Sequence, residues 1–434
     1  MIGAHFARPF GKGRQNAPAE ATVSPRAAAH RPSQTPQAQA TDRAADVPYA
    51  QGRSRLDRAW RRVYAAVLKT VFRATHSAEQ RHSERLWPHA RVIRDDAGRV
   101  TRFVVHGRDF PLANADASIR QGAGAAGAQG ETNVPGQPTL PPLHLIACGP
   151  SVAQIDYPAL TAATPTHKRI GVNGAVALTR QYGMQFDYYC ITDNGFIRHR
   201  EDLVAHLIAQ DLVLFTTPIC LWTILQRFPQ SAFRCRVFLM ERVGQQALRP
   251  KECYADVVAR SNGTMAHFDT AMPLGFSHDI ARGVFPGGTV AFEALQVAAW
   301  LGHGDVYLHG LDLGNAAEKP RFYESPEDKL PTMIHRQLEG EILPSFQHAA
   351  PILRAKRVRV TNLSMESALD RSVFPKVDWR MLPCMLAYAT IARAHRRTEP
   401  ERKPDAAESE QSAQSARGSS PSRRGDWHHH SAAA

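Results

Sequence analysis

The middle of the chain alternates short apolar segments with helical segments, and this alternation limits the possible folds more than any other feature. Helices are indicated between most of the apolar segments, most clearly over Thr289–Leu301. Strands that alternate with helices form parallel sheets, because each helix returns the chain to the start of the next strand. The sequence therefore predicts an α/β fold, a Rossmann-like and mostly parallel sheet with helices on both faces. The predicted strands are His144–Cys148, Arg169–Val172, Phe186–Thr192, Leu212–Thr216, Asp305–Leu308 and Val358–Thr361.

Small and polar residues follow the ends of the first three predicted strands. The first strand leads into Gly149-Pro150-Ser151, the second into Asn173 and the third into Asp193. In open α/β sheets, ligands bind outside the carboxyl ends of the strands, so these residues mark the expected binding edge. Gly149 lets the backbone approach a ligand closely, and Ser151 can cap a helix whose N–H groups receive a phosphate. An ordinary strand-to-helix turn explains the same residues.

A second candidate anion site begins at Gly288-Thr289. Thr289 is expected to cap the following helix, and the glycine before it leaves the first backbone amides of that helix open to an anion. The next predicted strand leads to Asp312, which places this carboxylate at the rim of the sheet. Asp312 can bind a ribose or sugar hydroxyl, or it can cap nearby backbone amides.

The formal net charge of +13 is unevenly distributed. Residues 1–110 carry 20 basic and 9 acidic side chains, residues 393–434 carry 8 and 6, and the middle carries 25 of each. A domain that binds nucleic acid needs a basic surface of its own to neutralise phosphates. The neutral middle therefore argues against a nucleic-acid partner and leaves a basic N-terminal tether open.

The basic N-terminal region contains one strongly amphipathic segment, residues 54–73. Apolar side chains recur there at steps of three and four residues from Leu56 to Phe72, and the whole segment carries six Lys or Arg residues. Such a helix can lie on an anionic membrane, with Trp60 and Tyr64 at the headgroup boundary. Packing on the main domain is the other interpretation.

Composition also predicts the compartment. The chain has no secretory-type apolar segment near its start and no uncharged apolar run of 18 residues, so we expect neither export nor a membrane span. The six cysteines are scattered without a Cys-x-x-Cys pair, which argues against a zinc module and a disulfide framework. These features favour the reducing cytoplasm.

Five parts are predicted along the chain. The two ends are polar and of low complexity, and they are expected to be disordered. A basic helix and a β-hairpin precede a flexible linker, and the linker leads into one large domain. The predicted bounds are 1–52 for the disordered N-terminus, 53–112 for the helix and hairpin, 113–141 for the linker, 142–392 for the domain and 393–434 for the tail.

The order of motifs in the middle of the chain carries a family resemblance. The motifs are Ile146–Ser151, Val172–Gly174, Ile191–Asp193, Gly288–Thr289, Tyr307–Asp312, Arg321–Glu324, Ile342–Phe346, Asn362–Ser364 and Phe374-Pro375. Their order and spacing resemble the bacterial CMP-sugar transferases, which include the family 42 sialyltransferases. The last four motifs favour a related group, the transferases of Kdo (3-deoxy-D-manno-octulosonic acid) that decorate the lipopolysaccharide inner core.

The resemblance implies roles for individual residues. In the sialyltransferases the nucleotide is held by a Gly-Pro-Ser turn, by residues after the second and third strands, and by a Ser or Thr at a later helix start. The corresponding positions here are Gly149, Ser151, Asn173, Asp193 and Thr289, with Gly288 beside them. Tyr323 matches a tyrosine that meets the departing phosphate, and Arg321 is expected to replace a second one that this sequence lacks.

The implied reaction also needs a base for the acceptor hydroxyl and a cation for the donor carboxylate. The resemblance implies a histidine base in a late loop. His335 is the first candidate and His348 and His309 follow, although each can be a structural histidine. Arg282 and Arg336 are the candidate partners of the carboxylate, or they are solvated surface residues. No Asp-x-Asp pair follows a strand end, so no metal and no other cofactor is expected.

These features together predict an inverting, metal-independent glycosyltransferase. It would move Kdo from CMP-Kdo to a Kdo or sugar hydroxyl of lipid A-core, as a peripheral protein on the inner face of the bacterial inner membrane. Its expected partners are CMP-Kdo, the lipid A-core acceptor and an anionic membrane surface contacted through residues 54–73. The alternatives are another CMP-ulosonate transferase such as a sialyltransferase, a pterin-type pyrophosphokinase, and a non-catalytic, membrane-tethered nucleotide-binding domain.

Overall fold

The computed structural model describes residues 55–77, 90–113, 119, 140–261, 263–267, 274–314 and 318–388. The predicted disordered ends and most of the predicted linker lie outside these residues. The predicted domain bounds therefore stay predictions.

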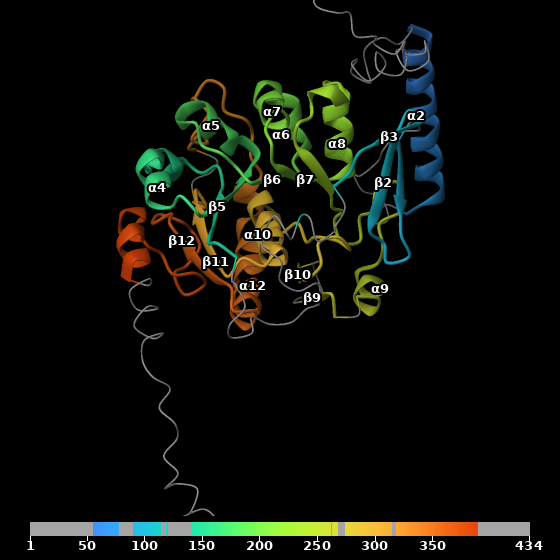
Figure 1. The fold of residues 1–434 in the computed structure, drawn as a ribbon. Coiled ribbons are helices and arrows are strands. Elements are labelled where there is room, and N and C mark those ends of the chain that lie inside the picture. The colour runs from blue at the N-terminus through green and yellow to red at the C-terminus, as the bar shows by residue number, and fades with distance from the viewer. Residues whose placement is uncertain are drawn as a thin grey trace, which may run out of the picture. The chain divides into compact units, whose positions relative to one another are not determined.

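A seven-stranded parallel sheet forms the centre of the described chain (Figure 1). Its strand order is β12-β11-β4-β5-β6-β7-β8. The chain builds outward from β4 to β8 and then returns to the other side of β4, so the strand order reverses between β4 and β11. The predicted α/β sheet is confirmed, although β8 was not predicted. The strands are β4 (Leu143–Ile146), β5 (Lys168–Val172), β6 (Tyr188–Ile191), β7 (Val213–Thr216), β8 (Arg236–Leu239), β11 (Asp305–His309) and β12 (Arg359–Asn362).

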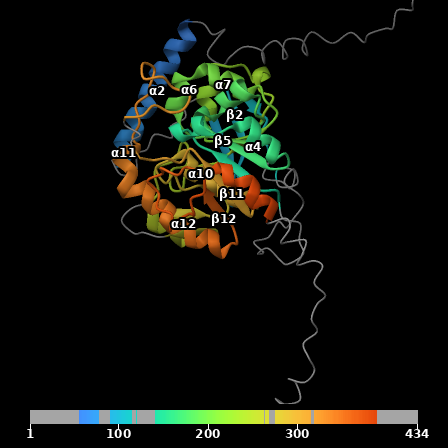
Figure 2. The ribbon, with the colours of Figure 1, turned by 90° about the vertical axis from the view of Figure 1, so that its left-hand side faces the viewer.

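Helices cover both faces of this sheet, as predicted. Figures 1 and 2 show α6 and α7 on one side of it and α10 and α12 on the other. The described helices of this region are α4 (Tyr157–Ala163), α5 (Ala177–Tyr182), α6 (Asn194–His199), α7 (Glu201–Ile208), α8 (Pro218–Leu225), α9 (Tyr254–Ala259), α10 (Val290–Leu301), α11 (Ile334–Gln337) and α12 (Leu343–Ala355). A two-stranded antiparallel sheet, β9 (Met265–His267) and β10 (Gly275–Ser277), precedes α10.

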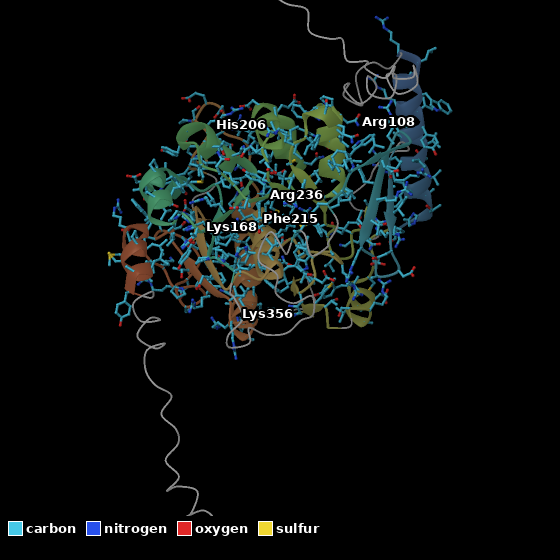
Figure 3. The ribbon with its side chains drawn as sticks, viewed as in Figure 1. Arg108, Lys168, His206, Phe215, Arg236 and Lys356 are labelled. Atoms are coloured by element: carbon cyan, nitrogen blue, oxygen red, sulfur yellow. The ribbon has the colours of Figure 1, made fainter. Side chains whose placement is uncertain are left out.

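Two hydrophobic cores lie on the two faces of the sheet because side chains alternate along each strand. On β6, Tyr188 belongs to the core that contains α10 and α12, whereas Tyr189 belongs to the core that contains α4 to α8. Phe215 on β7 is fully buried in the first core, and Figure 3 shows it inside the molecule. Burial on both faces explains why the strands read as continuous apolar runs in the sequence.

Helix α10 has well-defined ends, and its amino end lies at the carboxyl edge of the sheet. Thr289 accepts a hydrogen bond from the Ala291 backbone N–H through Oγ1 at 3.4 Å, so it caps the helix as predicted. Gly302 ends the helix in the left-handed conformation, with φ of 100°. The buried side-chain amide of Gln296 ties the helix to the preceding loop, because it donates to the Phe285 carbonyl at 2.7 Å.

A three-stranded antiparallel sheet precedes the main sheet. Its strands β1 (Ala90–Arg94), β2 (Val100–Val105) and β3 (Arg108–Phe110) confirm the predicted hairpin and add a third strand to it. Arg94 anchors this sheet, because its Nε and Nη2 atoms each donate to a carboxylate oxygen of Glu241 at 2.6 Å. Glu241 lies two residues after the end of β8 in the main sheet, and both side chains of the pair are buried.

The predicted amphipathic helix is present as α2 (Arg55–Thr75). Several of its large apolar side chains are exposed: Trp60 is 63% exposed and Val67 is 52% exposed. Leu68 and Phe72, on another stripe of the helix, are half-buried. Among the described helices, none combines the length and the apolar character that a membrane span requires.

Candidate functional site

A cavity of about 800 Å³ opens at the carboxyl ends of the parallel strands. Its wall includes the turns after β4, β5, β6 and β11, the amino end of α10 and the loop that leads to α11. The strand order reverses between β4 and β11, and this is where α/β sheets bind ligands. The predicted site residues that line the cavity are Gly149, Asn173, Asp193, Gly288, Thr289, Asp312, Arg321 and Tyr323.

The turns after β4 and β11 meet at one side of this cavity. The Gly149 backbone N–H donates to the Gly310 carbonyl at 2.9 Å, and a Cβ atom at position 149 would overlap the carboxylate of Asp312. Asp312 accepts hydrogen bonds from the Ser151 backbone N–H at 2.8 Å and from the Ser151 hydroxyl at 2.5 Å. Ser151 itself does not line the cavity. Ser151 holds Asp312 in place. Asp312 thus binds a nearby backbone amide, which is the second of the two roles expected for it.

The turn after β5 presents a buried side-chain oxygen that forms no hydrogen bond with the protein. Asn173 is in the left-handed region with φ of 43°, and its carbonyl accepts a hydrogen bond from the Tyr189 hydroxyl at 2.7 Å. The Oδ1 atom of its side chain is buried and forms no hydrogen bond with the protein. The Tyr323 ring packs against the next residue, Gly174, where a Cβ atom would overlap it. Asn173 and Tyr323 therefore lie side by side in the cavity wall.

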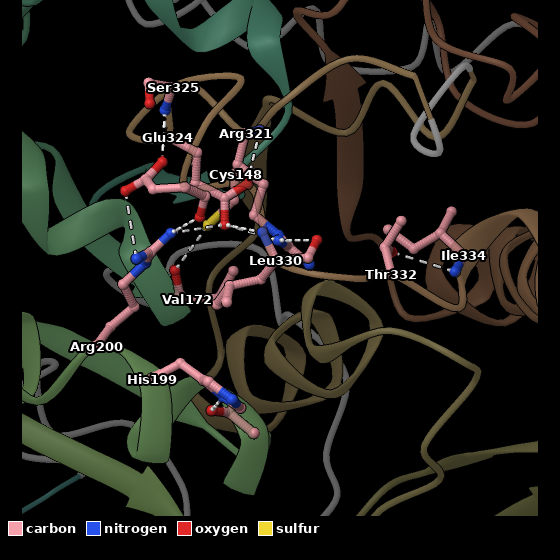
Figure 4. Close-up of polar contacts among 12 residues, drawn as sticks. Cys148, Val172, His199, Arg200, Arg321, Glu324, Ser325, Leu330, Thr332 and Ile334 are labelled. Atoms are coloured by element: carbon pink, nitrogen blue, oxygen red, sulfur yellow. Dashed lines mark hydrogen bonds and ion pairs between the residues drawn. The ribbon is translucent and has the colours of Figure 1, made fainter.

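The loop that carries Tyr323 is held by a buried carboxylate (Figure 4). Glu324 accepts hydrogen bonds from the Arg321 side chain at 2.8 Å and from the Arg200 guanidinium at 3.4 Å. Arg200 also donates to the backbone carbonyl of Asp328 at 2.6 Å. These bonds join the loop to the junction of α6 and α7. Burial raises the pKa of the Tyr323 phenol, so this side chain stays protonated and can donate a hydrogen bond.

Cys148 also lines the cavity, directly before Gly149. Its thiol donates to the Val172 carbonyl at 3.2 Å, and burial raises its pKa to about 12. Because the thiolate is the reactive form of cysteine, this thiol is inert at neutral pH.

Asp193 and Thr289 both serve as helix caps at the cavity. The Asp193 carboxylate accepts a hydrogen bond from the Gly195 backbone N–H at 2.8 Å and begins α6. Gly288, with φ of 69°, lies directly before the Thr289 cap of α10. The positive end of the α10 dipole therefore points at the cavity.

Four of the predicted site residues do not line the cavity. Ser151 lies behind Asp312, and Arg282 is half-buried outside the lining. His335 and Arg336 are exposed on α11, whose neighbouring residues Met333, Ile334 and Gln337 do line the cavity. The structure thus places the predicted base and both predicted carboxylate partners outside the cavity wall.

The other histidines have different surroundings. His348 is exposed on α12. His309 is buried, and its Nε2 lies 2.8 Å from Nδ1 of His144, whose Nε2 lies 2.9 Å from Nδ1 of His167. Burial lowers the pKa of His309 to about 3, that of His167 to about 4 and that of His144 well below its usual value. A base needs a pKa nearer to neutral, so this chain of neutral histidines is suited to structural hydrogen bonding.

The sequence did not predict two cavity residues whose side chains can take part in binding or catalysis. His199, at the end of α6, lines the cavity, and its Nδ1 lies 2.7 Å from the Gly195 carbonyl (Figure 4). Since a carbonyl only accepts, Nδ1 carries the proton and Nε2 of the neutral ring is an acceptor. Arg242 also lines the cavity and pairs with Glu293. No strand was predicted before Arg242, so nothing in the sequence marked it as a strand-end residue.

The comparisons with known proteins concern the part of the chain that supplies α10, β11 and the following loop to this cavity. Residues 269–380 match the family model described as "3-deoxy-D-manno-octulosonic acid transferase WaaZ". The resemblance to Kdo transferases is confirmed. The region similar to Kdo transferases contains α10, β11, α11, α12 and β12, and with them Thr289, Asp312 and Tyr323.

Two curated relatives are named "Probable 3-deoxy-manno-octulosonic acid transferase". The one from Escherichia coli (strain K12) is 32% identical over 102 residues, which are 24% of this chain and 34% of the relative. The one from Salmonella typhimurium (strain LT2) is 31% identical over 117 residues, 27% of this chain and 42% of the relative. The chain thus spans less than half the length of each Kdo transferase relative.

One solved structure, titled "Structure of MAf glycosyltransferase from Magnetospirillum magneticum AMB-1", aligns with a TM-score of 0.36. The alignment is 16% identical in sequence and covers 58% of this chain and 37% of that chain.

Proposed function

We propose that this chain is a glycosyltransferase that moves Kdo from CMP-Kdo to a Kdo or sugar hydroxyl of lipid A-core in lipopolysaccharide synthesis. The observation that carries the proposal is the position of the region similar to Kdo transferases. This region supplies the amino end of α10, the rim carboxylate Asp312 and the phenol of Tyr323 to the cavity at the strand reversal.

The nucleotide would lie between the turns after β4 and β5. Gly149 gives the backbone room for a close approach, and the unpartnered Oδ1 of Asn173 suits an N–H or O–H donor of the nucleotide. The amino end of α10, with Gly288 and Thr289, and the capping residue Asp193 would complete the nucleotide site.

The proposed reaction is a single displacement. The acceptor oxygen attacks the anomeric carbon of Kdo while the bond from this carbon to the CMP phosphate oxygen breaks, and the electron pair leaves with CMP. Tyr323 and Arg321 would donate hydrogen bonds to the departing phosphate. A histidine would take the proton of the acceptor hydroxyl, and His335 remains the proposed base because it directly follows cavity residues. This displacement inverts the anomeric configuration and is proposed to need no metal.

The exposed face of α2 is proposed to place the enzyme on the anionic inner face of the inner membrane. Trp60, Val63 and Val67 present apolar surface, and the exposed cations Arg62 and Lys69 lie on the same helix. This combination suits an interfacial helix on anionic lipid.

We expect Trp60→Glu to reduce co-sedimentation with phosphatidylglycerol vesicles at least tenfold, whereas Tyr182→Ser, at an exposed site on α5, leaves it unchanged. Vesicle binding that survives Trp60→Glu would contradict this role of α2.

The reaction is tested by incubating the full chain with CMP-Kdo and a Kdo-lipid A acceptor, with EDTA or with Mg²⁺. The expected result is release of CMP and a glycolipid heavier by one Kdo residue, at equal rates in both conditions. Thermal shift by CMP but not by ATP and Mg²⁺ should accompany it. Stabilisation by ATP and Mg²⁺ alone would favour the pyrophosphokinase, equal use of CMP-sialic acid another ulosonate transferase, and CMP binding without transfer a non-catalytic domain.

A further inference from the structure

Arg242 is held rigidly where the chain leaves β8. The Val284 backbone N–H donates to the Glu241 carbonyl at 2.8 Å, and the Val243 backbone N–H donates to the Val284 carbonyl at 3.0 Å. The residue between these two bonds is therefore fixed by backbone pairing on both sides. Its side chain extends from this short ladder into the wall of the cavity.

A buried carboxylate orients the Arg242 side chain. Glu293 lies in the first turn of α10 and is 1% exposed. Its Oε1 accepts a hydrogen bond from Arg242 Nε at 2.9 Å, and its Oε2 accepts one from the Thr192 hydroxyl. Arg242 Nη2 also lies 3.4 Å from the Thr192 carbonyl. An arginine whose Nε edge is bound in this way presents its planar fork in one direction, which reduces the entropy that is lost when an anion binds.

The surroundings of this guanidinium suit an anion. Gly288 and Thr289, at the positive end of α10, line the same cavity as Arg242. Other cations also line this wall: Arg321 pairs with Glu324, Lys329 donates to the Glu318 carbonyl at 3.0 Å, and Lys319 is exposed. Arg242 differs from them in its direct contact with the first turn of α10, through Glu293. The sequence-based candidates for an anion partner, Arg282 and Arg336, do not line the cavity.

We propose that Arg242 binds the carboxylate of the donor sugar and that Glu293 is its positioning residue. This inference rests on the proposed function, since it names the cation that recognises a 2-keto acid sugar. A planar guanidinium matches a planar carboxylate with two parallel hydrogen bonds, which a neutral sugar cannot form. The same cation could bind the phosphate of CMP, and the experiment separates the two anions.

The test compares Arg242→Gln, Arg242→Lys and Glu293→Gln with the wild-type full chain. The KM for CMP-Kdo and the dissociation constant for CMP are measured for each protein. Arg242→Gln should raise the KM for CMP-Kdo at least tenfold and leave the CMP dissociation constant within twofold, because CMP has no carboxylate. Arg242→Lys should recover part of the loss. Glu293→Gln should raise the KM less than Arg242→Gln, with kcat within about threefold of the wild-type value.

Arg236→Gln is the matched control, since it removes the same charge from an exposed arginine at the other end of β8. It should leave both constants unchanged. A CMP-Kdo analogue with an amide in place of the carboxylate should bind wild-type and Arg242→Gln proteins equally.

Four outcomes would overturn the assignment. An unchanged KM in both Arg242 variants would remove this residue from donor recognition, and an equal loss of CMP and CMP-Kdo binding would assign it to the phosphate. A wild-type chain that neither binds CMP nor transfers Kdo would overturn the proposed function and the Arg242 assignment together. A wild-type chain that transfers Kdo while its Arg242→Gln variant does so equally well would overturn the assignment alone.

Discussion

The ring of Tyr323 lies against Gly174 so closely that no side chain fits at position 174. Gly174→Ala should therefore displace Tyr323 from the cavity wall. We expect a cost of about 1–3 kcal/mol in the free energy of unfolding, as for other overpacked sites, and at least a tenfold loss of transfer. Urea unfolding and initial rates measure the two effects. Gly340→Ala is the control, because a Cβ atom there meets no atom within 4 Å. Full activity in Gly174→Ala would show that the position of Tyr323 does not matter.

Thr289→Val removes the α10 cap with little change in volume. We expect a loss of about 1 kcal/mol in the free energy of unfolding and weaker CMP binding, measured by urea unfolding and calorimetry. Thr217→Val is a matched control, since Thr217 caps α8 in the same way but does not line the cavity. It should lose similar stability and keep its CMP affinity. Equal CMP affinities in the two variants would separate the α10 cap from the nucleotide site.

His335→Ala should retain CMP affinity and lose transfer by roughly a hundredfold, because a general base contributes about this much. His199→Ala is measured in parallel, since His199 lines the cavity and its Nε2 is an acceptor. If His335→Ala keeps its turnover and His199→Ala loses it, the base is His199.

The buried histidines predict acid sensitivity. The folded-state pKa of His167 is about 4 and that of His309 is about 3, both below the value of about 6.5 in an unfolded chain. The unfolded state thus binds more protons below about pH 6.5, so acid favours unfolding. As the pH falls from the unfolded-state pKa to the folded-state pKa of a buried histidine, that histidine should lower the free energy of unfolding by roughly 1.4 kcal/mol per pH unit. Urea unfolding at pH 5, 6 and 7 measures this slope. His167→Gln should reduce it, whereas a slope equal to that of the wild type would exclude His167.

The features that the sequence predicted well depend on local patterns. An apolar run followed by Gly located the turn at Gly149, and a Thr before a helical pattern located the cap at Thr289, because a strand end and a helix start are encoded by neighbouring residues. The pairing of Arg242 with Glu293 depends on β8, whose strand begins with an exposed arginine and was not recognised. The partner of Asp312 was left open for a similar reason, because Ser151 is 161 positions away in the sequence.

The buried pair of Arg94 and Glu241 determines where the chain can be shortened. A version that starts at the predicted linker, after residue 112, would lack Arg94 and the sheet that carries it, so the carboxylate of Glu241 would lose its cation. Loss of one partner of a buried ion pair costs several kcal/mol, typically 3–5. The backbone of Glu241 also pairs with Val284, next to Arg242, so the damage would begin at the cavity wall. The β1 to β3 sheet therefore has to be retained when a shorter fragment is produced for crystallisation or ligand screening.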